Sequence, residues 1–244
     1  DLKRQVHRKT SAHQSGMICS GEQTVLLYQA GAKDLEAVEN IIAALREYHG
    51  GTLMLTPDAI YFDAGPAPQH ASFVQLSASE WEYTAAVGNT SFLHIIGGGH
   101  CSLALSRLIR TTGFHITVYD DRPGLLTMEQ NDAAHERITL GDYTELKDRV
   151  PQGDNIYVVV MTFGYRSDDM ALRALLHHRF RYLGLLGSRS KVEKMLVDYR
   201  REGIPEDLLS PIRTPAGLPI NSRTPEEIAI SIAAEIIQVK NVVI

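Results

Sequence analysis

The second half of the chain alternates short apolar runs with longer amphipathic stretches. Residues 92–96, 115–119, 155–161 and 181–186 are rich in β-branched and aromatic residues, which predicts buried strands. Residues 100–112 carry apolar positions at helical spacing, with arginines between them. Alternation of buried strands with helices predicts an α/β fold built on a doubly wound parallel sheet.

The last helix has a clear start signal. Thr224 suits the N-cap, Pro225 the first helical position, and Glu227 completes a capping box before the apolar residues 228–239. Further helices are predicted over residues 168–178 and 191–202, and residues 122–131 are predicted to form a loop.

The first part of the chain has a different pattern. Residues 1–14 are polar and basic and are expected to be a mobile or packing segment. A helix is predicted over residues 32–48. Short strands are predicted at residues 24–28, 52–56, 59–62, 73–76 and 80–86. A polar turn near Gly88-Asn89 predicts two domains: a smaller N-terminal α+β domain at 1–89, expected to be truncated because the chain lacks an initial Met, and a Rossmann-like domain at 90–244.

A glycine turn joins the first strand of the Rossmann-like domain to its helix. Gly97, Gly98 and Gly99 permit a tight turn and close approach of a phosphate to the backbone, where the helix start offers unpaired N–H groups. Asp120 and Asp121 end the next strand, as expected for a carboxylate that binds ribose hydroxyls. This arrangement predicts either a bound dinucleotide or the bare architecture of the fold.

Composition narrows the class of protein. The net charge is −5, with 44% hydrophobic and 22% charged residues, as in soluble globular proteins, and no basic stripe predicts a nucleic-acid partner. No apolar run is long enough for a membrane helix, and the first residues do not form a signal peptide. Two cysteines make no disulfide framework, so a cytoplasmic location is expected.

Five further residues are candidates for binding a ligand or metal, and each also has a purely structural interpretation. Cys19, between glycines, is either a small buried residue or an exposed thiol and soft metal ligand. Cys101 is either a packing residue or a thiol activated by the helix dipole. His100 either binds an anion or caps the helix, and Ser188 with Arg189 either binds an anion or forms an ordinary N-cap.

No catalytic set accompanies this predicted anion site. Tyr143 and Lys147 match the Y-x-x-x-K pattern of short-chain dehydrogenases, but they follow the glycine turn too closely for that role. The sequence has no nucleophile elbow and no Walker motif. An NAD(P)-dependent oxidoreductase and a nucleotide-binding sensor therefore stand as alternatives to a non-enzymatic binding protein.

Several blocks of the chain resemble the xanthine dehydrogenase accessory factor family (XdhC/CoxI). The resemblance extends over about 91–238, with the cysteine motif of the family's N-terminal domain at 16–21. The blocks are at 97–100, 118–123, 182–189, 215–220, 224–229 and 231–236.

The resemblance implies a chaperone that binds the molybdenum cofactor (molybdopterin), assists its sulfuration and inserts it into a xanthine dehydrogenase-type molybdenum hydroxylase. It implies that hydroxylase, a cysteine desulfurase and a second copy of the chain as partners. Cys19 becomes the candidate molybdenum contact. The residues implied to hold the pterin phosphate are Gly97, Gly98, Gly99, His100, Ser188 and Arg189.

Overall fold

The chain forms two compact units, residues 1–88 (unit 1) and 89–244 (unit 2), in the computed structural model. The structure describes residues 2–7, 21–46, 49–68, 70–77, 79–88 and 91–242.

Unit 1 is built of antiparallel strands and one helix. The strand β1 (Leu2–His7) pairs antiparallel with β2 (Gly21–Leu26), so residues 2–7 of the segment expected to be mobile or to pack form a strand, which the sequence analysis did not predict. Pairing with β2 gives the backbone of this polar segment regular hydrogen-bond partners. The helix α1 (Leu35–Arg46) follows the short turn η1 (Ala32–Asp34). A second sheet has the order β4-β3-β6-β5, with β3 at Gly51–Leu55, β4 at Ile60–Asp63, β5 at Ser72–Ser77 and β6 at Glu80–Val87.

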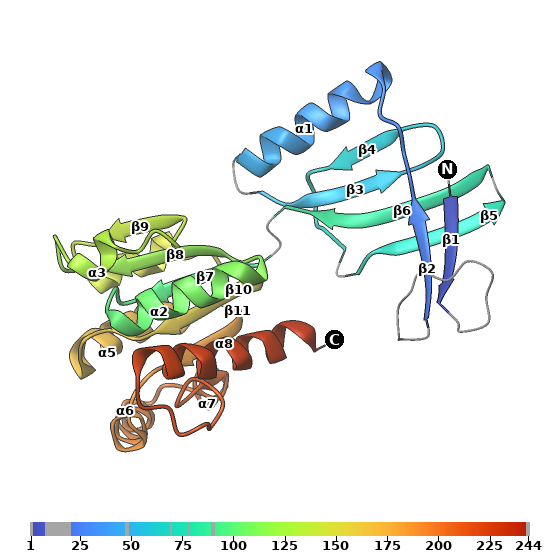
Figure 1. The fold of residues 1–244 in the computed structure, drawn as a ribbon. Helices are drawn as coiled ribbons and strands as arrows, with labels where there is room; N and C mark the ends of the chain where they lie inside the picture. The colour runs from blue at the N-terminus through green and yellow to red at the C-terminus, as the bar shows by residue number, and fades with distance from the viewer. Residues whose placement is uncertain are drawn as a thin grey trace. The chain divides into compact units, whose positions relative to one another are not determined.

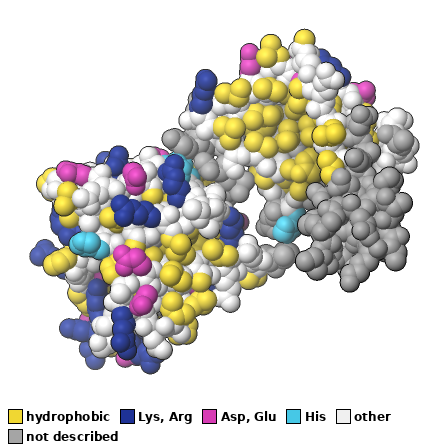
Figure 2. All heavy atoms as spheres, in the orientation of Figure 1, with side chains coloured by type: hydrophobic (Ala, Val, Ile, Leu, Met, Phe, Trp, Pro, Cys, Tyr) yellow, Lys and Arg dark blue, Asp and Glu magenta, His cyan; other side chains and the backbone are white. Residues whose placement is uncertain are grey.

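Unit 1 buries little apolar surface among its described residues. Trp81 and Ala44 are its buried hydrophobic side chains, whereas Leu35, Ile42 and Leu45 of α1 are exposed. Figure 2 shows hydrophobic side chains gathered on one face of this unit. Most of the hydrophobic core of the described chain therefore belongs to unit 2.

Unit 2 contains a six-stranded parallel sheet with the order β12-β11-β10-β7-β8-β9. Its strands are β7 (Phe92–Ile96), β8 (His115–Asp120), β9 (Glu136–Thr139), β10 (Gly153–Val160), β11 (Phe180–Leu185) and β12 (Ile212–Arg213). This is the strand order of the Rossmann fold, which reverses between β7 and β10. The predicted fold class is therefore confirmed.

Helices cover both faces of this sheet (Figure 1). They are α2 (His100–Ile109), α3 (Leu126–Glu129), α4 (Leu146–Arg149), α5 (Tyr165–Leu175), α6 (Arg189–Arg201), α7 (Glu206–Leu209) and α8 (Pro225–Asn241), with 3-10 turns η2 (Arg110–Thr112) and η3 (Tyr143–Glu145). Successive strand residues point to opposite faces. Val158 therefore packs beneath α5 and α6, whereas Val159 packs beneath α2 and α8.

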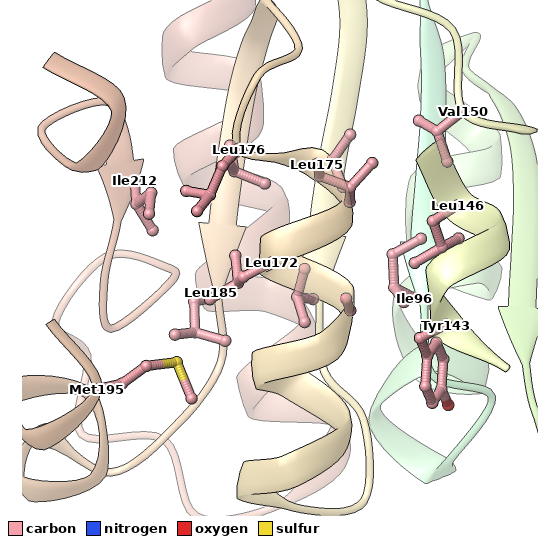
Figure 3. Close-up of a cluster of buried hydrophobic side chains, with 14 of the residues drawn as sticks. Ile96, Tyr143, Leu146, Val150, Leu172, Leu175, Leu176, Leu185, Met195 and Ile212 are labelled. Carbon is pink, nitrogen blue, oxygen red and sulfur yellow. The ribbon is translucent and has the colours of Figure 1, made fainter. Parts of the chain in front are cut away.

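The α5 face of the sheet forms one continuous core. Figure 3 shows Leu172 and Leu175 of α5 between Met195 of α6 on one side and Tyr143 and Leu146 on the other. These side chains are almost inaccessible to solvent. This packing fixes the positions of α5 and α6, whose first turns lie at the carboxyl end of the sheet.

Some elements of unit 2 differ from the sequence prediction. The expected loop at 122–131 contains α3, whose Thr127 and Met128 are buried. The expected helix start at Asp168 is three residues late, because Gly164 in extended conformation is the N-cap of α5. In the described part of the chain, no helix has both the length and the apolar content needed to cross a bilayer.

Candidate functional site

The glycine turn between β7 and α2 lies where the strand order reverses. Gly97 has φ +108°, and its N–H donates to the Tyr119 carbonyl at 2.7 Å. A Cβ at Gly97 would lie 2.4 Å from the Met161 carbonyl oxygen, and one at Gly98 would lie 2.4 Å from the Met128 side chain. Neither position has room for a side chain: the backbone at Met161 limits Gly97, and the Met128 side chain limits Gly98.

Gly99 is the glycine of this turn that faces open space. A Cβ there would meet no atom of the described residues within 4 Å, and its φ of −73° is ordinary for any residue. Gly99 is also the N-cap of α2, and no side chain among the described residues caps this helix start. The first N–H groups of α2 thus lack helical partners in a place that a ligand can reach, which is the geometry of an anion site. His100 is exposed beside them.

Asp120, at the end of β8, belongs to the scaffold of this turn. Its carboxylate accepts a hydrogen bond from Gly98 N at 2.7 Å and another from Arg122 N at 2.9 Å. The Arg122 guanidinium donates two more, from Nε and Nη2, each at 2.8 Å. Burial acts to raise the pKa of Asp120, but the bonds from Arg122 and Gly98 outweigh it and hold that pKa below its ordinary value.

Arg122 joins two loops across the glycine turn. Its guanidinium carbon lies 5.7 Å from the centre of the Phe163 ring, a cation–π contact between the loops after β8 and β10. The Phe163 side chain is 89% exposed. The exposed ring thus lies at the carboxyl end of the sheet, the edge where ligands bind in this fold. We call the glycine turn, Arg122 and Phe163 together the mouth.

A second ion pair lies at the ends of β10 and β11. The fully buried Asp168 accepts hydrogen bonds from the Thr162 backbone N–H at 3.0 Å and from its hydroxyl. Lys191, in the first turn of α6, donates to the other carboxylate oxygen of Asp168. This pair links the loop that carries Phe163 to the start of α6.

Ser188 and Arg189 begin α6 at the same edge of the sheet. The Ser188 hydroxyl is the N-cap and accepts from Lys191 N at 3.4 Å. Arg189 is exposed. The structure thus places the predicted residues of unit 2 at the carboxyl ends of the central strands, where ligands bind in this fold.

The two cysteines have different outcomes. Cys19 lies outside the described residues. Cys101 is half-buried against the cluster beneath α2 and α8, and burial, together with the charge of Glu226, raises the pKa of its thiol. These surroundings favour the packing interpretation of Cys101 over an activated thiol. The described residues contain no group of three or more His, Cys, Asp or Glu side chains that could hold a metal ion.

Sequence reasoning placed residues 120–122 and 162–164 at this edge of the sheet, but it gave no role to Arg122, Phe163 or Lys191. For Arg122 a local signal existed, because an arginine two residues after a strand-ending aspartate can fold back onto it. Phe163 and Lys191 gave no such signal, since their partners lie in other loops. The loop after β12 also reaches this edge, where Ala216 N donates to the Leu185 carbonyl at 2.9 Å.

This fold defines a Rossmann-type domain. Comparison with known families matches residues 93–236, more than half of the chain, to the XdhC Rossmann domain. The chain therefore belongs to the XdhC family, as the resemblance of its sequence blocks had indicated.

Two individual proteins are similar to this chain. An uncharacterized Escherichia coli (strain K12) protein, YqeB, is 28% identical over 242 residues, which are 95% of this chain and 41% of YqeB. A Bacillus subtilis (strain 168) protein, named as a probable xanthine dehydrogenase subunit, is 32% identical over 148 residues, 61% of this chain and 42% of that protein. The chain thus spans about four tenths of the length of these relatives.

A solved structure shares the fold. A Bacillus halodurans protein described as a xanthine dehydrogenase superposes with a TM-score of 0.73, over 98% of this chain and 75% of that one, at 22% sequence identity. At this identity the likeness concerns the fold alone.

Proposed function

We propose that this protein is a non-enzymatic accessory factor that binds the molybdenum cofactor and assists its sulfuration and insertion into a xanthine dehydrogenase-type molybdenum hydroxylase. Membership of the XdhC family supports the proposal, as does the B. subtilis relative whose name links it to a xanthine dehydrogenase. The partners proposed with it are that hydroxylase, a cysteine desulfurase and a second copy of the chain, and the proposed location is the cytoplasm.

The observation that carries the proposal is the open, uncapped start of α2 at Gly99. The cofactor is a planar pterin with a phosphate arm and a metal-binding dithiolene. The N–H groups after Gly99 and the half-exposed Arg122 fit the phosphate, and the exposed Phe163 ring fits the flat pterin. When bound, the cofactor supplies the molybdenum on which sulfuration takes place.

The buried carboxylates at this edge support a carrier over a catalyst. Asp120 is paired with Arg122, and Asp168 with Lys191. A general base needs a lone pair directed at a substrate proton. Here the carboxylate oxygens are directed at cations and backbone N–H groups of the protein itself, so their role is to hold the loops in place.

Two further contacts belong to the proposal. Ser188 and Arg189 offer a second anion contact at the start of α6. Cys19, in unit 1, offers the thiol for the metal, since thiolates are soft ligands that suit such centres.

A co-elution experiment tests this function. Purified protein is mixed with molybdenum cofactor released from a molybdoenzyme, and the pterin that elutes with the protein is measured by fluorescence after oxidation. Gly99→Asp places a carboxylate in the open space at the start of α2, so the variant should fold and repel the phosphate. We expect about tenfold or greater loss of bound pterin, which is a loss of about 1.4 kcal/mol or more.

The matched control is Gly31→Asp. Gly31 also has open space for a side chain and ordinary backbone angles, but it lies in unit 1 before α1. The Gly31→Asp variant should bind as much pterin as the unaltered protein. The function is refuted if no pterin elutes with the unaltered protein, and the proposed phosphate position is refuted if the Gly99 variant binds as well as the Gly31 variant. Cys19→Ala tests the thiol in the same assay.

A further inference from the structure

The carboxylate that would bind ribose in a dinucleotide site already accepts hydrogen bonds from groups of the protein itself. In Rossmann domains that bind NAD, the acidic residue at the end of the second strand accepts hydrogen bonds from ribose hydroxyls. Asp120 occupies this place, and a carboxylate has about four acceptor positions. Oδ1 accepts from Arg122 N and Nε, and Oδ2 accepts from Gly98 N and Arg122 Nη2. No acceptor position of Asp120 remains for a ribose.

Burial and charge make this pairing hard to displace. The Asp120 side chain is 1% exposed, so a ribose would first have to move the guanidinium aside. The Arg122 guanidinium brings a positive charge and two parallel hydrogen bonds to the Asp120 carboxylate, whereas a ribose hydroxyl brings no charge to neutralise it. Removing Arg122 from Asp120 would also leave a buried charge without its partner.

Arg122 itself stays within reach of a ligand. Its side chain is 39% exposed, and its guanidinium has N–H groups beyond the two that Asp120 accepts. The contact with Phe163 fixes its orientation from the other side. Where a dinucleotide site presents a carboxylate to the ligand, this mouth therefore presents the Arg122 guanidinium, which Asp120 and Phe163 hold in place.

We propose that Arg122 is the specificity-determining residue of the mouth. By saturating Asp120 it rejects the ribose of adenine dinucleotides, and by its exposed N–H groups it favours a phosphorylated planar ligand that has no ribose at this position. The inference goes beyond the proposed function, since it concerns what the mouth excludes and holds for any such phosphorylated ligand.

Titration with NADH, followed by its fluorescence, tests this inference on the full chain. We expect no saturable binding to the unaltered protein. Arg122→Ala frees the Asp120 carboxylate and should bind NADH at least about tenfold more tightly than the unaltered protein. The double variant Arg122→Ala with Asp120→Asn should lose this gain in NADH affinity. That result would show that the gain comes from the Asp120 carboxylate and not from Asp121.

Two variants serve as controls. Arg107→Ala, in the last turn of α2, removes an exposed cation without touching Asp120 and should leave NADH binding unchanged. Arg122→Gln keeps a neutral donor and should gain less affinity than Arg122→Ala.

Titrating the unaltered protein with NADH and NADPH needs no variant. Saturable binding of NADH would overturn the inference, and so would saturable NADPH binding, because Arg122 would then hold a 2′-phosphate. Unchanged NADH affinity in both Arg122 variants would overturn it as well. The pterin co-elution assay judges the proposed function separately, so failure of one can be told from failure of the other.

Discussion

His94 illustrates how single buried side chains control the response of unit 2 to acid. It lies on β7, its Nδ1 is 3.1 Å from the Tyr119 hydroxyl, and its Nε2 has no hydrogen-bond partner in the described part of the chain. Burial, together with the charge of His115, lowers the pKa of His94 from 6.5 to about 4. The native state therefore holds the neutral imidazole across a range in which the unfolded chain is protonated.

This predicts a loss of stability in mild acid. Because the native pKa is depressed, the unfolded state binds more protons between the two pKa values, and stability falls as the pH is lowered. From about pH 7.5 to about pH 5, His94 should cost about 2 kcal/mol of unfolding free energy. His94→Gln keeps a polar partner for Tyr119 but does not titrate, so its stability should change less with pH.

Urea unfolding at the two pH values measures this effect. Burial also lowers the pKa of His115 and His135, which act in the same direction, so the difference between the two proteins isolates His94. Equal pH dependence in the variant and the unaltered protein would contradict the assignment.

At the same scale, the sequence was a good guide to which residue types lie at the mouth and a poor guide to which of them are free to contact a ligand. Glycines at 97–99 were expected, but only the structure separates Gly97 and Gly98, which are closed by neighbouring atoms, from Gly99, which is open. Asp120 was expected at the mouth, but its pairing with Arg122 and Gly98 decides what it can do. Availability depends on contacts from other segments, which a local motif does not contain.

At the scale of elements, α8 is the helix that the sequence defined best. Thr224 accepts from Glu227 N at 3.2 Å, and the Glu227 carboxylate accepts from Thr224 N at 3.3 Å, so the predicted capping box is confirmed. The signal was readable because every partner lies within a few residues of the helix start.

Removing this cap should destabilise unit 2. Thr224→Ala leaves the Glu227 N–H without its side-chain partner, so we expect a loss of about 1 kcal/mol. In a domain of this size that lowers the midpoint of thermal unfolding by about 2–4 °C. Thr139→Ala, at an exposed position at the end of β9, is the control and should change stability by less than about 0.5 kcal/mol. Identical unfolding curves for Thr224→Ala and the unaltered protein would refute the role of the cap.

In the sheet of unit 2, the two edge strands were the strands that the sequence did not predict. β9 and β12 are short, and β12 consists of Ile212 and Arg213 alone. Such segments form strands because a longer neighbour supplies their hydrogen bonds, β8 for the former and β11 for the latter. A strand stabilised by its neighbour needs no hydrophobic pattern of its own.

At the scale of the molecule, the two units differ in how much apolar surface they bury. Unit 2 contains two large clusters of buried side chains, one on each face of its sheet. In unit 1 the described residues bury Ala44 and Trp81, and Leu35 remains 59% exposed. Hydrophobic burial is the main favourable term in folding, so unit 2 has the larger store of stability.

Unit 2 should therefore fold without unit 1. A fragment of residues 89–244 is expected to unfold in urea in a single cooperative transition, because both faces of its sheet are covered from within the fragment. Near-ultraviolet circular dichroism, which reports fixed aromatic side chains such as Tyr182, provides a second measurement. A fragment without a cooperative transition would show that unit 1 is needed for this fold.

The sequence by itself determined the Rossmann half of this protein: its buried strands, its glycine turn, the capped last helix and the family to which it belongs. Those features depend on periodicity and on partners a few residues apart. Only the tertiary structure decided that Gly99 has open space beside it, that Arg122 hydrogen-bonds the Asp120 carboxylate, and that the Phe163 ring is exposed beside them. The strand order brings the loops after β7, β8 and β10 together, and contacts between separate loops are set by that order and by no local pattern.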